Sequence, residues 1–249
     1  MNNFKLVGAG PRKILLLPGL LGTRDAFDAM LAYADTATFQ YACFEYRGYG
    51  EALHAAGACT LDEALGDIGA AVAQLDWPHF TVAGHSIGAL LAQMLALAMP
   101  QRVQALVSLG GMSARGGARD PQRQQMLARA AINEAQRRRM VDSGTGARYG
   151  PGFASAVVQS TWHAIRPDAF AGYASDAARI DISAQVDGSG VPLLALVGEF
   201  DPVNTAALAR ETTLRWYRNA RLDVLPGTGH YLMLEAPAAC VSAIEAFSP

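Results

Sequence analysis

The sequence predicts an α/β protein whose sheet is mostly parallel and is covered by helices on both faces. Short apolar runs that end in glycine or a polar loop lie at residues 13–19, 40–48, 79–84, 103–111, 191–199 and 220–227, and such runs are typical of buried parallel strands. Helix-compatible stretches lie between most of them, at residues 23–34, 61–75, 87–99 and 205–217, and another closes the chain at 236–247. Strand alternating with helix predicts a parallel sheet wrapped on both faces, and residues 4–7 would add an antiparallel edge strand.

Composition narrows the class of ligand and the compartment. The chain has 249 residues and is 51% hydrophobic, which is enough for a sizeable core. Its 20 Lys and Arg against 22 Asp and Glu give a net charge of −2, which argues against nucleic-acid binding. No apolar stretch reaches the about 18 residues of a membrane helix, and residues 1–19 lack the features of a secretory signal. We therefore expect a cytoplasmic protein that binds a small molecule and neither nucleic acid nor membrane.

The three cysteines and the stretch between residues 113 and 189 carry further information on the fold. The cysteines are widely spaced and predict neither a disulfide framework nor a metal site. Between about residues 113 and 189 no strand is expected, whereas helices are expected at residues 121–143, 153–165 and 167–179. We therefore expect a core domain of residues 1–112 and 190–249 with a helical cap of residues 113–189. The arginine triplet at residues 137–139 is expected on a solvated helix face, with an anion site as the alternative.

Ser86 is the candidate nucleophile. It is the centre of the G-x-S-x-G pentapeptide at residues 84–88, between an apolar run and an alanine-rich stretch. A serine at such a strand-to-helix turn projects its hydroxyl at the carboxyl end of the sheet, and the flanking glycines relieve close contacts. The alternative is an ordinary serine that caps the helix.

A serine nucleophile needs a base, and the base needs an acid to orient it. Of the five histidines, His230 lies in a glycine-flanked loop after the run at residues 220–227, where it can reach across the top of the sheet. Asp201 follows the run at residues 191–199 and is the candidate acid. The alternatives are that Asp201 caps the next helix or that Glu199 is the acid. His163 is the second histidine of interest, as a substrate contact.

The tetrahedral oxyanion needs hydrogen-bond donors. The backbone N–H of Ile87 follows the nucleophile directly, and the second donor should come from the loop after residues 13–19. We expect that donor to be the N–H of Leu20, with that of Leu21 as the alternative.

Together these motifs resemble the α/β-hydrolase superfamily, in the cap-bearing branch that includes small carboxylesterases and carbon–carbon bond hydrolases. Besides the pentapeptide, the resemblance rests on "FEYRGYG", "DISAQVDGSGVPLLALVGEFD" and "GTGHYLMLEAP" and covers nearly the whole chain. The order serine, aspartate, histidine is the order of that fold. The resemblance implies an α/β-hydrolase fold and acyl transfer to water through an acyl-enzyme at Ser86, without a cofactor.

The chain departs from the family pattern at two places. Pro18 and Gly19 replace the common His-Gly of the oxyanion loop, which removes a side chain that often braces that loop. Glu51 stands where a small polar residue is usual, so the nearby loop is expected to be reshaped. Residues 110–113 contain no acid, which argues against variants of the fold that place the acid there.

These observations favour a serine hydrolase of a small ester, lactone or thioester. Expected substrate contacts are Leu21, Trp162, His163 and Tyr231. The first alternative is carbon–carbon hydrolysis of a β-diketone-like substrate, for which Arg115, Arg148 or Arg166 would supply a cation. Acyl transfer to another acceptor and a receptor-like ligand-binding protein on the same fold are the others. The sequence carries no signal that fixes an oligomeric state.

Overall fold

A seven-stranded sheet forms the centre of the molecule. The computed structural model describes residues 3–117 and 121–249. The strands are β1 Phe4–Val7, β2 Arg12–Leu17, β3 Phe39–Phe44, β4 Phe80–His85, β5 Val103–Leu109, β6 Leu193–Gly198 and β7 Ala220–Leu225. Their order is β1-β3-β2-β4-β5-β6-β7, with β1 antiparallel to β3 and the other pairs parallel. The predicted mostly parallel sheet and its antiparallel edge strand are confirmed.

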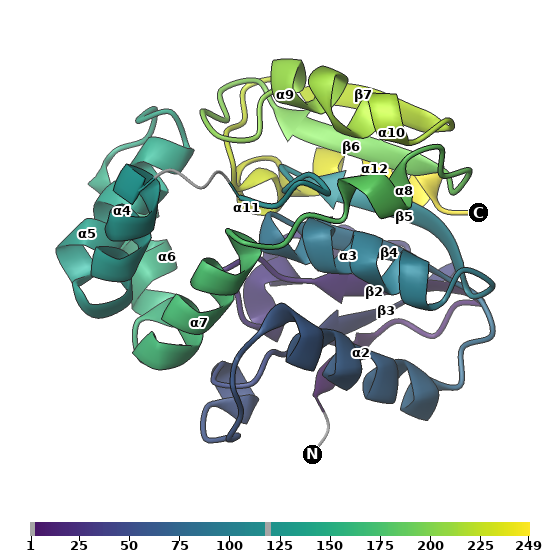
Figure 1. Cartoon of the computed structure of the whole chain (residues 1–249), viewed down its shortest axis with the longest axis horizontal. Coiled ribbons are helices and arrows are strands. Elements are labelled where there is room, and N and C mark those ends of the chain that lie inside the picture. The colour runs from purple at the N-terminus through teal and green to yellow at the C-terminus, as the bar shows by residue number, and fades with distance from the viewer. Residues whose placement is uncertain (1–2, 118–120) are drawn as a thin grey trace.

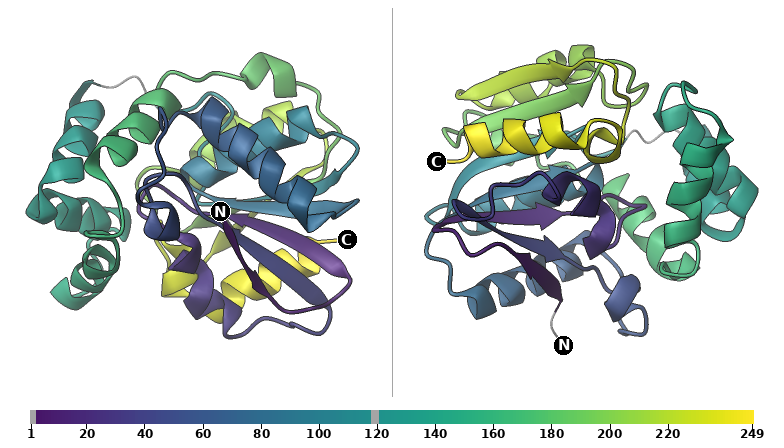
Figure 2. Two further views of the ribbon diagram at one scale, coloured as in Figure 1. Left: turned by 90° about the horizontal axis from the view of Figure 1, so that it is seen from below. Right: turned by 180° about the vertical axis from the view of Figure 1, so that it is seen from behind.

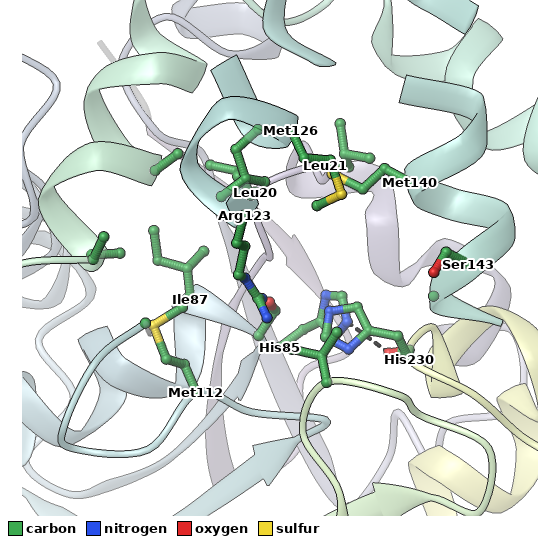
Figure 3. A pocket seen from close by; sticks show the side chains of 18 of the residues that line it. Leu20, Leu21, His85, Ile87, Met112, Arg123, Met126, Met140, Ser143 and His230 are labelled. Carbon is green, nitrogen blue, oxygen red and sulfur yellow. Dashed lines mark hydrogen bonds between the residues drawn. The ribbon is translucent and has the colours of Figure 1, made fainter. Parts of the chain in front are cut away.

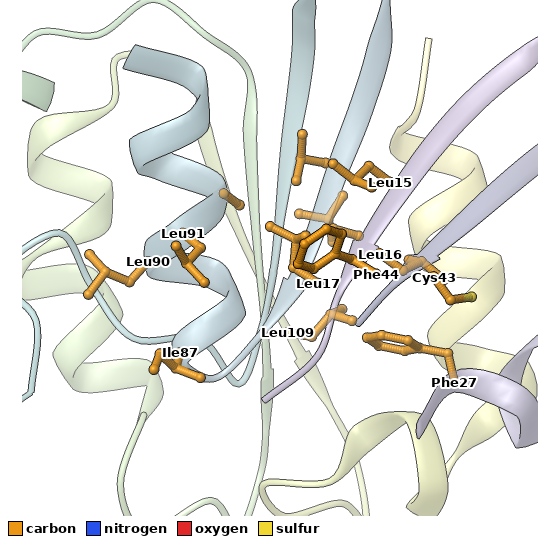
Figure 4. Close-up of a cluster of buried hydrophobic side chains, with 14 of the residues drawn as sticks. Leu15, Leu16, Leu17, Phe27, Cys43, Phe44, Ile87, Leu90, Leu91 and Leu109 are labelled. Atoms are coloured by element: carbon orange, nitrogen blue, oxygen red, sulfur yellow. The ribbon is translucent and has the colours of Figure 1, made fainter. Parts of the chain in front are cut away.

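Helices cover both faces of this sheet (Figures 1 and 2). On one face lie α2 Leu61–Leu75 and α3 Ile87–Ala98; α12 Pro237–Phe247 lies on the other, with α1 Asp28–Leu31 packed beside it. Residues 14–17 of β2 and all of β4 and β6 are buried, because a central parallel strand loses solvent on both sides. Figure 4 shows part of the resulting core, with side chains from β2, β3 and α3.

A group of helices is inserted between β5 and β6. It comprises α4 Pro121–Ile132, α5 Glu134–Gly144, α6 Pro151–Thr161 and α7 Pro167–Ala177, and the short α8 Ser183–Val186 leads back to the sheet. In Figure 1 helices α4 to α7 stand together at one end of the sheet. The helical nature of the insertion agrees with the sequence, whereas its division from the core as a separate domain stays a prediction.

Several helices are shorter or more broken than the sequence predicted. Residues 121–143 were expected as one helix, but the chain breaks at Asn133, whose side chain accepts a hydrogen bond from the N–H of Gln136 and so caps α5. Residues 205–217 form α9 Ala206–Glu211 and α10 Thr213–Trp216, separated at Thr212. Residues 23–34 form the 3₁₀ helix η1 Arg24–Phe27 followed by α1.

Arg137 corrects the expectation for the arginine triplet. Its side chain is fully buried and donates hydrogen bonds to the backbone carbonyls of Ala130, Ala131 and Thr161. Its guanidinium carbon lies 4.6 Å from the ring centre of Trp162 and 5.1 Å from that of Phe170. The expected solvated face was wrong for this residue, because the guanidinium caps helix ends inside the insertion.

Two further short helices are η2 Gly50–Ala52, in the connection after β3, and α11 Leu232–Glu235, in the connection after β7. Cys43, Cys59 and Cys240 are each buried and unpaired within the described residues. No helix of residues 3–117 and 121–249 is both long enough and apolar enough to cross a membrane.

Candidate active site

Ser86 lies at a sharp turn between β4 and α3. Its backbone has φ 53° and ψ −116°, a region that a residue with a side chain occupies only when its surroundings impose it. A Cβ at Gly84 would lie 2.2 Å from the carbonyl oxygen of Gly88, and a Cβ at Gly88 would lie 2.2 Å from that of Leu17. Only glycine fits at both positions, so the strand and the helix can approach closely enough to form the turn.

The alternative role of Ser86 as a helix cap does not fit this geometry. Although Ser86 occupies the cap position of α3, no described N–H of that helix donates to its side chain. By contrast, the side chains of Thr60, Asn133 and Thr205 each accept such a bond at the start of their helices. The Ser86 side chain instead belongs to the wall of a pocket above the sheet.

His230 is held by a buried carboxylate. Its Nδ1 lies 2.8 Å from Oδ2 of Asp201, whose side chain is inaccessible to solvent. The other oxygen, Oδ1 of Asp201, accepts hydrogen bonds from the N–H groups of Val203 and Asn204 at 2.9 and 3.1 Å. Burial alone would raise the pKa of Asp201, but His230 and these two N–H donors outweigh it and lower the pKa. Asp201 is therefore an ionised acceptor that fixes the Nδ1–H tautomer of His230.

The backbone around His230 is also fixed. The N–H of His230 donates to the carbonyl of Gly144, at the end of α5, over 2.8 Å. The carboxylate of Glu235 accepts the N–H of Gly229 at 2.7 Å and that of Tyr231 at 2.9 Å, and Arg148 pairs with it at 3.2 Å. Three consecutive N–H groups, at residues 229–231, are thus satisfied, so the loop that carries the histidine is held in one conformation.

His85, the neighbour of Ser86, does not compete with His230 for the role of base. Its Nε2 lies 2.9 Å from the carbonyl oxygen of His230, so Nε2 carries the proton. Burial, and secondarily the nearby His230, lowers the pKa of His85 to about 3, so the imidazole is neutral. A Cβ at Gly19 would lie 2.4 Å from Nδ1 of His85 and 3.3 Å from Cβ of Ser86, which explains the glycine in the loop after β2.

The residues of the two expected oxyanion donors line the same pocket. Leu20 and Ile87 both line it, and within the described residues neither N–H makes a backbone hydrogen bond. Ile87 is the first residue of α3, where N–H groups have no partner inside the helix. Both groups can therefore donate to a ligand oxygen beside Ser86.

The pocket lies between the carboxyl ends of the strands and the inserted helices (Figure 3). It is open to solvent on one side and encloses a cavity of about 130 Å³. Its apolar wall includes Leu20, Leu21, Ile87, Met112, Met126 and Met140. Among the described residues, no group of three or more His, Cys, Asp and Glu is arranged to hold a metal ion.

The structure brings only some of the expected substrate contacts to this pocket. Leu21 and Tyr231 line it. Trp162 and His163 do not; they line a separate hollow beside Ile132 and Arg166 of the insertion and Leu53 of the core. The lining of the candidate pocket therefore gives no support to these two expected contacts, and the ring of Trp162 packs against Arg137.

Arg123 is a pocket residue that the sequence reasoning missed. It lies on α4, and in Figure 3 its guanidinium reaches down into the pocket toward His85. Among the described lining residues it is the single Lys or Arg, and none is Asp or Glu. The three cations expected for carbon–carbon cleavage lie elsewhere: Arg148 pairs with Glu235, Arg166 pairs with Asp168, and Arg115 lies over the ring of Trp216. The residue pattern of the inserted helices does not show which arginine points into the pocket.

The sequence matches the family described as alpha/beta hydrolase fold over residues 13–237, which is most of the chain. The protein therefore belongs to the α/β-hydrolase family of enzymes, as the resemblance of its motifs implied. It is 27% identical to 3-oxoadipate enol-lactonase 2 of Acinetobacter baylyi over 252 residues, an alignment that covers 98% of this chain and 91% of the relative.

Solved structures share the whole architecture. A thermophilic esterase from Thermogutta terrifontis superposes with a TM-score of 0.84 at 21% identity, covering 98% of this chain and 91% of the esterase. The enol-lactonase of Burkholderia xenovorans gives a TM-score of 0.84 at 19% identity, covering 98% of this chain and 95% of that enzyme. At these identities the two structures show a shared fold.

Proposed function

We propose that the protein is a serine hydrolase that cleaves a small ester, lactone or thioester through an acyl-enzyme on Ser86. One observation carries the proposal: Ser86 and His230 line one pocket, and Nδ1 of His230 is bound to the buried carboxylate of Asp201. That bond leaves Nε2 of His230 as the nitrogen that can accept a proton. The 27% identical relative is named a lactonase, which supports an ester or lactone as the bond that is cleaved.

In the first half of the reaction, Nε2 of His230 takes the proton of the Ser86 hydroxyl as its oxygen attacks the substrate carbonyl carbon. Asp201 stabilises the imidazolium, and the N–H groups of Leu20 and Ile87 bind the oxyanion. The carbonyl then re-forms, the bond to the leaving oxygen or sulfur breaks, and His230 gives its proton to that atom.

In the second half, His230 takes a proton from water, whose oxygen attacks the acyl-enzyme. The ester bond to Ser86 breaks, His230 returns the proton to the serine oxygen, and a carboxylic acid is released. With a lactone the leaving oxygen stays attached to the acyl chain, so the product is one ring-opened acid.

We infer that the acyl part of the substrate carries an anionic group. Arg123 supports this because its guanidinium reaches into the pocket, and a guanidinium has five N–H donors, two of which bind a carboxylate in parallel. Among the described residues, Arg123 is also the cation that the rival carbon–carbon hydrolysis would use, since Arg115, Arg148 and Arg166 do not line the pocket.

Hydrolysis of a panel of nitrophenyl esters of increasing acyl length tests the proposal. We expect turnover by the unmodified protein and a loss of kcat of about 10³-fold or more in Ser86→Ala, because the nucleophile is removed. Ser160→Ala is the matched control, since Ser160 is exposed on α6 and does not line the pocket. Turnover of a β-diketone without turnover of any ester would favour carbon–carbon cleavage instead. Binding of a ligand without either reaction would favour the receptor.

A further inference from the structure

Two tyrosine hydroxyls donate hydrogen bonds to backbone carbonyls of the loop that carries Leu20. The hydroxyl of Tyr46 donates to the carbonyl of Pro18 over 2.9 Å, and the hydroxyl of Tyr49 donates to the carbonyl of Leu20 over 3.1 Å. Both tyrosines come from the loop after β3, and they are 3% and 0% exposed. The loop after β2 lacks the usual histidine, so its support comes from another part of the chain.

These bonds act on the peptide groups on either side of the candidate oxyanion donor. A trans peptide is planar, and its N–H points opposite to its C=O, so a bond that fixes the oxygen also fixes the direction of the hydrogen. Tyr46 fixes the Pro18–Gly19 peptide, and Tyr49 fixes the Leu20–Leu21 peptide. The peptide between them, which carries the N–H of Leu20, is fixed by the bond from the N–H of Gly22 to the carbonyl of Gly19 at 3.0 Å.

Burial keeps both hydroxyls in the donor state. It raises the pKa of Tyr46 and of Tyr49 well above the ordinary value for tyrosine. Removal of either hydroxyl would also leave a carbonyl oxygen facing a phenyl ring, with no donor in its place, and an unpaired buried carbonyl is costly.

The inserted helices pack onto the same pair of rings. Tyr173 of α7 lies with its ring centre 5.5 Å from that of Tyr46 and 5.8 Å from that of Tyr49. The Tyr46 and Tyr49 rings meet edge to face at 5.9 Å, and the Tyr173 hydroxyl donates to the carbonyl of Arg47 at 3.3 Å. The two hydroxyls are therefore carried by rings that pack against each other and against α7.

We propose that Tyr46 and Tyr49 are positioning residues that set the direction of the oxyanion donor in the loop after β2. This inference rests on the proposed function, because it concerns the same reaction. A donor must already point to where the oxyanion forms if it is to lower the barrier, and these hydroxyls hold the neighbouring peptides in place before the substrate arrives.

The test compares Tyr46→Phe and Tyr49→Phe with the control Tyr41→Phe. Each change removes one hydroxyl and keeps a buried ring; Tyr41 bonds to Glu245 at 2.5 Å, on α12 and outside the pocket. For each protein, kcat and KM are measured on a nitrophenyl ester. The inhibition constants of a trifluoromethyl ketone, which forms a tetrahedral adduct with serine, and of the matching methyl ketone are measured alongside thermal unfolding.

We expect Tyr46→Phe and Tyr49→Phe each to lower kcat by roughly 10-fold, less than the 10² to 10³-fold of a fully lost donor, with KM nearly unchanged. The inhibition constant of the trifluoromethyl ketone should rise by the same factor, and that of the methyl ketone should not change. Tyr41→Phe should change stability alone. Since the two variants are independent, either one tests the inference if the other does not fold.

Three results would overturn the inference. The first is that kcat and ketone binding in both variants match those of Tyr41→Phe while the unmodified protein hydrolyses esters; the proposed function would then stand without the inference. The second is a parallel weakening of both ketones and of KM, which indicates a general structural role. The third is an unmodified protein that neither hydrolyses esters nor binds the trifluoromethyl ketone more tightly than the methyl ketone, which would overturn the proposed function as well.

Discussion

At the scale of single residues, His230 is held at its ring and at its backbone. Its ring is bound by Asp201, its carbonyl by His85 and its N–H by Gly144 of α5. Each of these bonds fixes a different part of the residue, so the histidine reaches the pocket in one orientation.

Arg123 gives a prediction about substrate choice. Arg123→Met should lower kcat/KM for a nitrophenyl monoester of succinate by about 10- to 100-fold, because a charged hydrogen bond is worth about 1.5–3 kcal/mol. The butyrate ester, which is similar in length but uncharged, should lose little. Nitrophenol release from each ester separately gives the two values of kcat/KM, and their ratio tests the prediction.

Arg129→Met is the control for this prediction, because it removes the same charge from an exposed position on α4 that does not line the pocket. If the two variants discriminate equally between the esters, Arg123 does not select an anionic substrate.

The residues of the site differ in how far the sequence could predict them. Ser86, Asp201 and His230 lie in short motifs at strand ends, and parallel strands bring such ends to one edge of the sheet. Trp162 and His163 lie in the turn that follows α6, where the direction of a side chain depends on packing against the inserted helices. For the same reason, the sequence could not predict that Arg123 points into the pocket. Nor could it predict the burial of Arg137, whose partners are backbone carbonyls of two helices.

At the scale of elements, the turn from β4 to α3 depends on how closely two backbones approach. Gly84→Ala should lower the free energy of unfolding by about 1–3 kcal/mol, because its Cβ would lie 2.2 Å from the carbonyl oxygen of Gly88 and overpack the turn. We expect kcat to fall as well, since the shift displaces Ser86. Urea unfolding and ester kinetics measure the two effects.

Gly66→Ala should do the opposite for stability. Gly66 is exposed in the middle of α2, and a Cβ there would meet nothing within 4 Å, so the change should raise the free energy of unfolding by about 0.5–1 kcal/mol. Its ester kinetics should stay unchanged. Equal effects of the two substitutions would contradict the close-approach explanation.

The order of strands and helices could be predicted from the alternation of apolar runs and helical stretches. The residues at which the helices end could not. The breaks at Asn133 and Thr212 interrupt stretches that read as continuous helices, because one side-chain bond at each break outweighs weak local propensities.

At the scale of the whole molecule, the sheet and the inserted helices contribute to one pocket. Ser86, Leu20 and His230 come from loops at the carboxyl ends of strands, while Arg123, Met126 and Met140 come from α4 and α5. In the proposed reaction, the first group performs the chemistry and the second chooses the substrate. This division explains why the family could be predicted from the sequence, whereas the substrate selectivity of the pocket could not.

Peptide mass spectrometry after treatment with a fluorophosphonate tests most directly whether Ser86 is the nucleophile that becomes acylated. We predict one added phosphonyl group per chain, carried by the peptide that contains Ser86, and no addition in Ser86→Ala. Labelling should also slow in His230→Ala, because the base that activates the serine is lost. An unlabelled Ser86 peptide in folded protein, or equal labelling of Ser86→Ala, would contradict the account.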